Sequence, residues 1–319
     1  MLWLIPALLA TAVAATIIGY QMAFYAPEPH HKDIYELPKG SQYEEEKEWM
    51  HSLIRAMDAV PFEPVSITAR DGTVLFGRYY HVADGAPLQL QFHGYRSAGI
   101  QDFCGGNVLA REAGQNTLIV DQRAHGKSGG SAITFGVREQ YDCLDWVNWA
   151  NERFGPETPI FLSGVSMGAA TVLMAAGLPE LPDNVRGVIA DSPYSCPREI
   201  IRIVCRQMHL PPALICPFVF LGGRIIGGFD LSAGSPKEAV KQAKVPILMF
   251  HGEDDRMVPC DMSREIAENC ASPVRRETFP DAGHGLSYIL DKARYARATA
   301  EFFEFCMQLS SEKQAGKTL

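Results

Sequence analysis

Short apolar runs alternate with amphipathic stretches along most of this chain. Helix-compatible stretches, such as residues 140–154, separate the runs. Alternation of this kind predicts an α/β fold with a mostly parallel central sheet and helices on both faces. The predicted strands are LQLQFHGY (88–95), TLIVDQR (117–123), PIFLSG (159–164), VRGVIADSPY (185–194) and VPILMFHGEDD (245–255).

The first apolar segment differs from the others because it is long and uncharged. Residues 1–27 contain no Asp, Glu, Lys or Arg, and about 20 apolar residues cross a bilayer core. A cleaved signal peptide is the alternative, with a small-residue site at residues 12–14. We favour a retained single-pass anchor over residues 1–26, because the apolar run continues to Phe24 and no basic region precedes it. We expect the domain that follows to be extracytoplasmic, although the flanking charges do not determine the orientation.

Residues 27–60 are predicted to join this anchor to the domain. Residues 27–40 form a polar, proline-containing linker that we expect to lift the domain off the membrane. Residues 41–44, SQYE, have the spacing of a capping box, and apolar residues follow at helical intervals from Trp49 to Met57. The segment therefore predicts an amphipathic helix packed on the domain. A β-hairpin follows over residues 65–82, with Asp71 and Gly72 at its turn.

Composition limits the classes of protein that fit this pattern. A chain of 319 residues, 47% hydrophobic and 21% charged, can bury one sizeable core, which we assign to residues 61–310. The net charge of −8 argues against a nucleic-acid-binding surface. The eight cysteines show no C-x-x-C pair and no metal-ligand spacing. We interpret them as buried thiols, with disulfides as the less favoured alternative, and we predict no metal and no cofactor.

The sequence GVSMG places Ser166 between Gly164 and Gly168. A G-x-S-x-G match alone is weak, because it arises by chance in roughly one chain in ten of this length. Its setting adds weight, since an apolar run precedes it and a stretch rich in Ala, Leu and Met follows. Strand, sharp turn and helix are the context of a nucleophilic serine whose Oγ projects from the top of a sheet. We therefore predict that Ser166 is a nucleophile.

A serine nucleophile needs a general base, and His284 is our candidate. It follows the last strand-like segment, in the glycine-flanked loop PDAGHGLSY before the terminal helix. His93 and His251 each precede a glycine directly after a strand, and His125 lies in a polar turn. We predict structural roles for these three histidines.

The base needs a carboxylate to hold its tautomer, and HGEDDRMVP offers three after one strand. We choose Asp255, which lies deepest in that loop, and keep Glu253, Asp254 and Asp191 as rivals. The chain order Ser166, Asp255, His284 is the order expected for an α/β-hydrolase. For the oxyanion hole we predict the backbone N–H groups of Met167 and, from the loop after LQLQFHGY, Tyr95.

Several of these segments together resemble the serine-hydrolase branch of the α/β-hydrolase superfamily. The segments are QFHGYR, DQRAHGKSGG, GVSMGAA, HGEDDRMVP and AGHG, and the resemblance runs from about residue 65 to residue 305. More closely, the chain looks like bacterial membrane-anchored hydrolases of uncharacterised substrate, related to mammalian membrane-anchored α/β-hydrolase-domain proteins and to S33-type peptidases. The resemblance implies carboxylic-ester hydrolysis through an acyl-enzyme, with Ser166, Asp255 and His284 matching the family's triad.

Residues 193–230 are predicted to form a short helical lid. The segment is rich in Ile, Leu and Phe and is broken by proline and glycine pairs. Such an insertion can line an apolar acyl pocket, or it can cap the core without a selective role. We predict hydrolysis of a small-molecule or lipid-like ester, with thioesters also open. An S33-like peptidase or acyltransferase is the alternative, and a non-catalytic binding protein fits less well because none of the nucleophile, base and acid is missing.

Overall fold

An eight-stranded sheet forms the centre of the protein. The computed structural model describes residues 4–28, 30 and 32–317. The strands follow the order β1-β2-β4-β3-β5-β6-β7-β8; β2 is antiparallel to β1 and β4, and the remaining pairs are parallel. The bounds are β1 (Glu63–Thr68), β2 (Val74–Tyr80), β3 (Leu88–Phe92), β4 (Asn116–Asp121), β5 (Ile160–Val165), β6 (Val185–Asp191), β7 (Ile247–Gly252) and β8 (Val274–Phe279). The predicted mostly parallel sheet and its N-terminal hairpin are confirmed.

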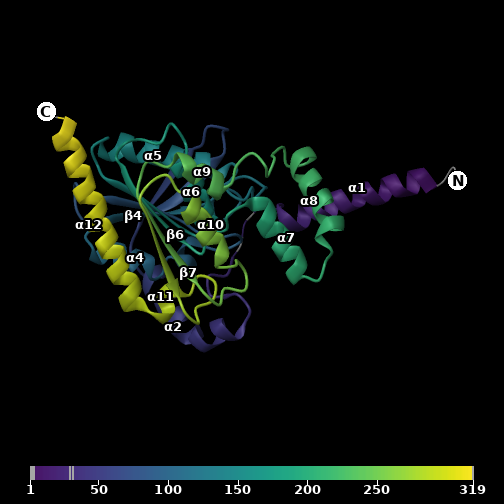
Figure 1. Cartoon of the computed structure of the whole chain (residues 1–319), viewed down its shortest axis with the longest axis horizontal. Coiled ribbons are helices and arrows are strands. Elements are labelled where there is room, and N and C mark those ends of the chain that lie inside the picture. Colours follow the sequence, from purple (N-terminus) through teal and green to yellow (C-terminus); the bar gives the residue numbers. More distant parts are fainter. Residues whose placement is uncertain (1–3, 29, 31, 318–319) are drawn as a thin grey trace.

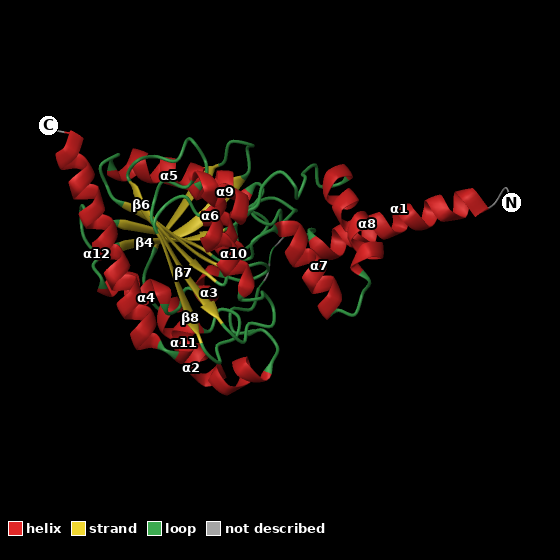
Figure 2. Cartoon of the chain, viewed as in Figure 1, coloured by secondary structure: helices red, strands yellow, loops and turns green. Residues whose placement is uncertain are grey.

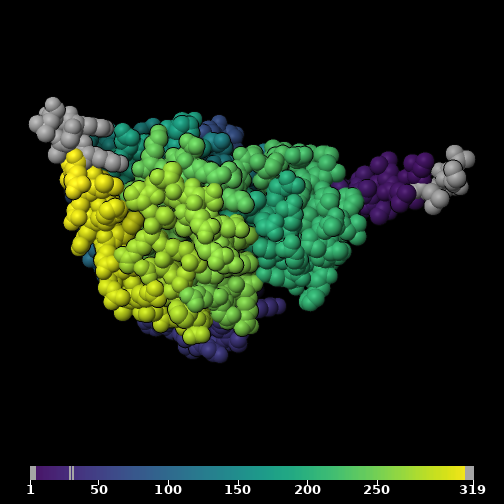
Figure 3. Space-filling model, in the orientation of Figure 1, coloured from purple at the N-terminus to yellow at the C-terminus, as the bar shows by residue number. Residues whose placement is uncertain are grey.

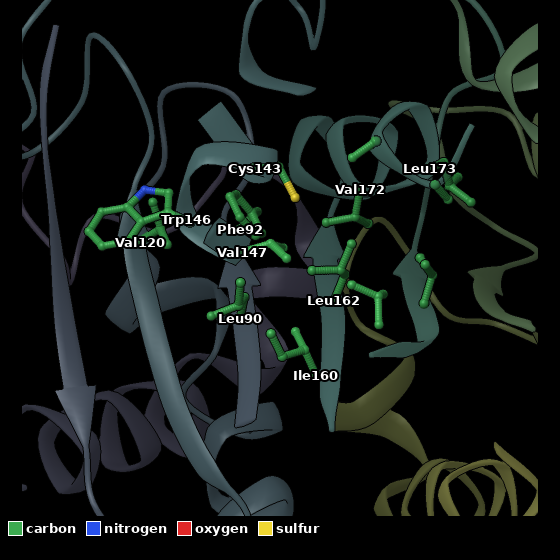
Figure 4. Packing of buried hydrophobic residues seen from close by; sticks show 14 of the residues in the cluster. Leu90, Phe92, Val120, Cys143, Trp146, Val147, Ile160, Leu162, Val172 and Leu173 are labelled. Atoms are coloured by element: carbon green, nitrogen blue, oxygen red, sulfur yellow. The ribbon is translucent and has the colours of Figure 1, made fainter. Parts of the chain in front are cut away.

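Helices cover both faces of this sheet (Figure 2). Their bounds are α2 (Ser41–Asp58), α3 (Gly99–Asp102), α4 (Gly106–Glu112), α5 (Glu139–Phe154), α6 (Met167–Ala176), α9 (Pro236–Ala239), α10 (Asp261–Asn269), α11 (Ser287–Leu290) and α12 (Lys292–Lys317). Neighbouring residues of one strand point to opposite faces. Leu162 therefore packs with Trp146 and Val172 of α5 and α6, whereas Phe161 packs with Phe303 of α12. Figure 4 shows the α5–α6 side of this core.

The N-terminal helix and the predicted lid lie together at the end of the molecule away from α12 (Figure 1). The helix α1 (Leu4–Ala23) contains an apolar stretch, Ile5–Ala23, long enough to cross a membrane. The lid consists of α7 (Pro197–Gln207) and α8 (Pro212–Ile225). In the space-filling view, α1 projects beyond the lid (Figure 3).

The inner end of α1 joins the catalytic domain directly. The N–H of Ile133 donates to the carbonyl of Phe24, and the N–H of Ala26 donates to the carbonyl of Ser131. Residues 32–40 then lie along the domain, where Leu37 packs against buried apolar side chains. Backbone bonds therefore hold the end of α1 against the domain, whereas the expectation that the linker lifts the domain off the membrane stays a prediction.

Two local predictions also differ from the structure. The helix over residues 41–58 is present, but its N-cap is Gly40 and no side chain caps it, so the predicted capping box does not form. The strand β8 was not predicted. Its sequence, VRRETF, is largely polar because it lies at the sheet edge and pairs only with β7.

Candidate active site

Ser166 occupies a strained turn between β5 and α6. Its φ of 54° lies in the left-handed region, which residues other than glycine rarely adopt. The flanking glycines are required by close approach. A Cβ at Gly164 would lie 2.2 Å from the backbone of Gly168, and one at Gly168 would lie 1.8 Å from the carbonyl oxygen of Phe92. Strain and close packing of this kind are typical of a serine presented for chemistry.

The structure brings His284 and Asp255 together. His284 Nδ1 lies 2.7 Å from Asp255 Oδ2. The other carboxylate oxygen accepts the backbone N–H groups of Met257 (2.9 Å) and Val258 (2.8 Å). Because these bonds fix the carboxylate, Asp255 can hold the His284 ring in one orientation with Nε2 free to act.

Electrostatics favour a charged pair at this contact. Burial acts to raise the pKa of Asp255, but the His284 charge and the hydrogen bonds from His251 and His284 outweigh it and hold the pKa well below its ordinary value. Burial acts to lower the pKa of His284, but the neighbouring Asp255 carboxylate prevails and raises it. The arrangement therefore stabilises the imidazolium that forms when His284 takes a proton.

The rival carboxylates have other partners. Glu253 accepts from Thr278, and Asp254 accepts from Gln42 and Arg256. The Asp191 carboxylate accepts the hydroxyl of Ser192, and burial raises its pKa to about 6.

The three histidines that were predicted to be structural, His93, His125 and His251, contact loop backbone. His251 Nε2 lies 3.0 Å from the carbonyl oxygen of Val258 and 3.2 Å from Asp255 Oδ2, which makes it a support of the acid. His93 Nε2 accepts the N–H of Gln122, and His125 Nε2 accepts the N–H of Arg96. These contacts agree with the predicted structural roles.

The loop that holds Tyr95 is fastened at several points. Asp102 accepts the N–H of Gly94 (2.6 Å) and the hydroxyl of Ser97 (2.6 Å). The Tyr95 hydroxyl donates to the carbonyl of Ala23 at the end of α1 (3.0 Å). Among the described residues, no hydrogen-bond acceptor engages the backbone N–H of Tyr95 or of Met167. Both groups therefore keep a free donor, and Tyr95 lines the cavity of Ser166.

Ser166 and His284 line one cavity of about 180 Å³. Its other walls come from the loops after β3 and α3, from strands of the sheet and from α2, α4, α11 and α12, with Met50, Phe103 and Leu109 among its apolar residues. None of its lining residues comes from 193–230. The expectation that the lid lines the pocket is therefore wrong, because α8 packs against α1 and α7 packs against α8.

Two residues at this site were missed by sequence reasoning. Asp102 fastens the Tyr95 loop, and Tyr43 donates its hydroxyl to the carbonyl of His284 at 2.7 Å. Tyr43 lies 241 positions before His284, and no catalytic motif contains either residue. Among the described residues, no group of three His, Cys, Asp or Glu side chains forms a metal site, and all eight cysteines are free thiols.

Comparisons with known proteins agree with this fold. A sequence profile of the α/β hydrolase fold matches residues 92–215. The uncharacterized protein YqkD of Bacillus subtilis is 28% identical over 197 residues, which cover 61% of this chain and 64% of YqkD. A lysophosphatidylserine lipase of Rattus norvegicus is 26% identical over 247 residues, covering 69% of this chain and 56% of the lipase. The chain thus spans less than two thirds of the length of either relative.

Solved structures show the same fold. An esterase of Pyrococcus furiosus superposes with a TM-score of 0.63 at 22% identity, covering 78% of this chain and 92% of the esterase. Esterases and lipases among the similar proteins support a hydrolase. The sheet, the strained serine turn and the matching profile lead to one conclusion: the chain has the α/β-hydrolase fold.

Proposed function

We propose that this protein is a serine hydrolase that cleaves carboxylic esters and is anchored to a membrane by α1. The observation that carries the proposal is the shared cavity: the strained Ser166 and the Asp255-paired His284 both line it. Its walls are mostly apolar, which suits an acyl chain. At about 180 Å³ it is smaller than the roughly 300–1,000 Å³ of drug-sized sites, so it fits a short acyl group or part of a longer one.

The chemistry follows from the roles of these side chains. His284 Nε2 takes the proton of the Ser166 hydroxyl as Oγ attacks the ester carbonyl, and Asp255 stabilises the resulting imidazolium. The N–H groups of Met167 and Tyr95 donate to the tetrahedral oxyanion. Collapse of that intermediate expels the alcohol, which takes the proton from His284. Water, activated by the same histidine, then releases the acid and regenerates Ser166.

An ester suits the cavity better than a peptide with a free amine. A peptide amine would need an available carboxylate, and the two acidic side chains in the cavity lining, Asp102 and Asp191, already accept hydrogen bonds from the protein. Thioesters share the acyl-enzyme chemistry and are equally compatible with the apolar wall.

Hydrolysis of p-nitrophenyl esters of increasing chain length tests the proposal. We expect turnover by the wild type and a loss of at least about 10³-fold in Ser166→Ala, because the nucleophile is removed. Ser66→Ala, at an exposed position of β1, is the matched control and should retain wild-type activity. Equal activity of Ser166→Ala and wild type would overturn the assignment.

A further inference from the structure

The lid helix α8 is apolar around its circumference. Residues 212–223 contain no charged side chain. One face is buried through Cys216, Val219 and Gly222. On the opposite face, Leu214, Leu221 and Ile225 are 61%, 42% and 70% exposed, and their spacing of seven and four residues places them on one stripe. A helix at a water-exposed surface carries polar residues on its outer face, so the apolar stripe of α8 requires another explanation.

The buried face of α8 packs directly on α1. A Cβ at Gly222 would lie 2.9 Å from the carbonyl oxygen of Thr16, and one at Gly19 would lie 3.1 Å from the side chain of Val219. Small residues at such contacts let two helices approach closely, which is common between helices in membranes. Figure 1 shows α8 beside α1 at the end of the molecule away from α12.

The position of this contact along α1 determines how deep in a membrane α8 would lie. The apolar stretch Ile5–Ala23 has 19 residues, about 28 Å at 1.5 Å per residue, close to the roughly 30 Å of a hydrocarbon core. The part before Thr16 is about 11 residues long, roughly 16 Å, which is only half of that thickness. If α1 spans the bilayer, its contact with α8 therefore lies inside the hydrocarbon region.

We propose that α8 is embedded in the same membrane as α1, with Leu214, Leu221 and Ile225 in contact with lipid acyl chains. The proposal rests on the membrane-anchored hydrolase proposed above. It accounts for the apolar stripe because the stripe adjoins the surface of α1. The outer residues of α1 are also exposed and apolar, for example Leu8 at 69%.

Charges near the stripe fit the boundary of a membrane. Four arginines lie on α7 and near the end of α8: Arg198, Arg202, Arg206 and Arg224. Arg202 and Arg206 pair with Glu199, and Arg224 pairs with Asp230. Guanidinium groups at a membrane boundary also attract lipid phosphates. The inner end of α1 contacts the active-site loop through Tyr95 and Ala23. An embedded α8 thus holds the cavity of Ser166 next to the bilayer surface, and the substrate class it favours is an ester that resides in the bilayer.

Tryptophan quenching measures the embedding without reference to activity. The full chain, with Trp3→Phe to reduce background, is reconstituted into phosphatidylcholine vesicles with and without brominated acyl chains. Emission from an added Leu221→Trp should fall by at least about twofold in brominated vesicles. Val74→Trp is the matched control, since Val74 is 47% exposed on β2, and its emission should not change. Equal quenching at the two positions would overturn the proposal. The proposal would also be overturned if the emission of Leu221→Trp were not quenched and chemical cross-linking trapped the protein as a dimer. That result would indicate that a second copy of the chain covers the apolar stripe.

An activity measurement separates this proposal from the proposed function. Leu221→Asp should hydrolyse soluble p-nitrophenyl butyrate within twofold of wild type, but should lose at least about tenfold on a long-chain ester held in vesicles. Leu221→Ser replaces it if the aspartate variant does not fold. Equal losses on both substrates in a folded variant would contradict the proposal. Quenching at Leu221→Trp in an enzyme inactive on both esters would instead refute the ester hydrolase and leave the embedding supported.

Discussion

Replacing Phe24 by alanine tests whether the end of α1 belongs to the core of the catalytic domain. The Phe24 side chain is fully buried although it directly follows a candidate membrane helix. Its ring meets Phe229 and Phe135 edge-on, with centroids 5.0 and 5.9 Å apart. Removing a buried phenylalanine costs about 3–5 kcal/mol, because apolar contacts are lost and a cavity remains. For a chain of this size, we expect the melting temperature to fall by roughly 5–10 °C.

The assay is thermal unfolding followed by circular dichroism, with all variants in one detergent and at one scan rate. Ile18→Ala is the matched control on the same helix, because Ile18 is 54% exposed; it should change the free energy of unfolding by less than about 0.5 kcal/mol. Melting temperatures that fall equally in the two variants, or not at all in Phe24→Ala, would refute the packing of α1 into the domain.

Further predictions concern the candidate active site. His284 acts as a base only when its ring is neutral, and its pKa is raised. We therefore expect kcat/KM to rise with pH, with a midpoint above the ordinary histidine pKa of about 6.5. Asp255→Asn removes the charge that raises the pKa of His284, so this midpoint should move to lower pH while turnover falls by about 10²–10⁴-fold; an unmoved midpoint would contradict the pairing. Asp254→Asn should leave turnover within a few-fold of wild type. If it lost as much turnover as Asp255→Asn, the assignment of Asp255 as the acid that pairs with His284 would be refuted. Gly168→Ala should yield little folded protein by size-exclusion chromatography, since its Cβ would lie 1.8 Å from the Phe92 carbonyl oxygen; a folded and active variant would show that the turn can relax.

The central strands could be predicted because they are buried on both sides. The strand β7 begins with ILMF and is buried along its whole length, so its apolar sequence predicts its central position directly. The edge strand β8 carries mostly polar side chains and has one neighbour, and such a pattern does not distinguish a strand from a loop. The serine turn was recognisable because its geometry imposes glycines at fixed spacing around Ser166.

The walls of the site were not predictable in the same way. Asp102 and Tyr43 reach the site through contacts that depend on the final packing, and neither lies in a spacing that chemistry dictates. The lid was expected over the pocket because its apolar residues suit an acyl chain. In the structure one face of α8 contacts α1 instead. Gly19 and Gly222 let the two helices approach closely, although they are about 200 positions apart in sequence.

Covalent labelling with a fluorophosphonate, followed by peptide mass spectrometry, tests the central claim most directly. The account predicts one phosphonyl adduct, located on Ser166, which disappears in Ser166→Ala and forms far more slowly in His284→Ala. An adduct on another residue, or equal labelling of wild type and Ser166→Ala, would contradict the proposal that Ser166 is the nucleophile.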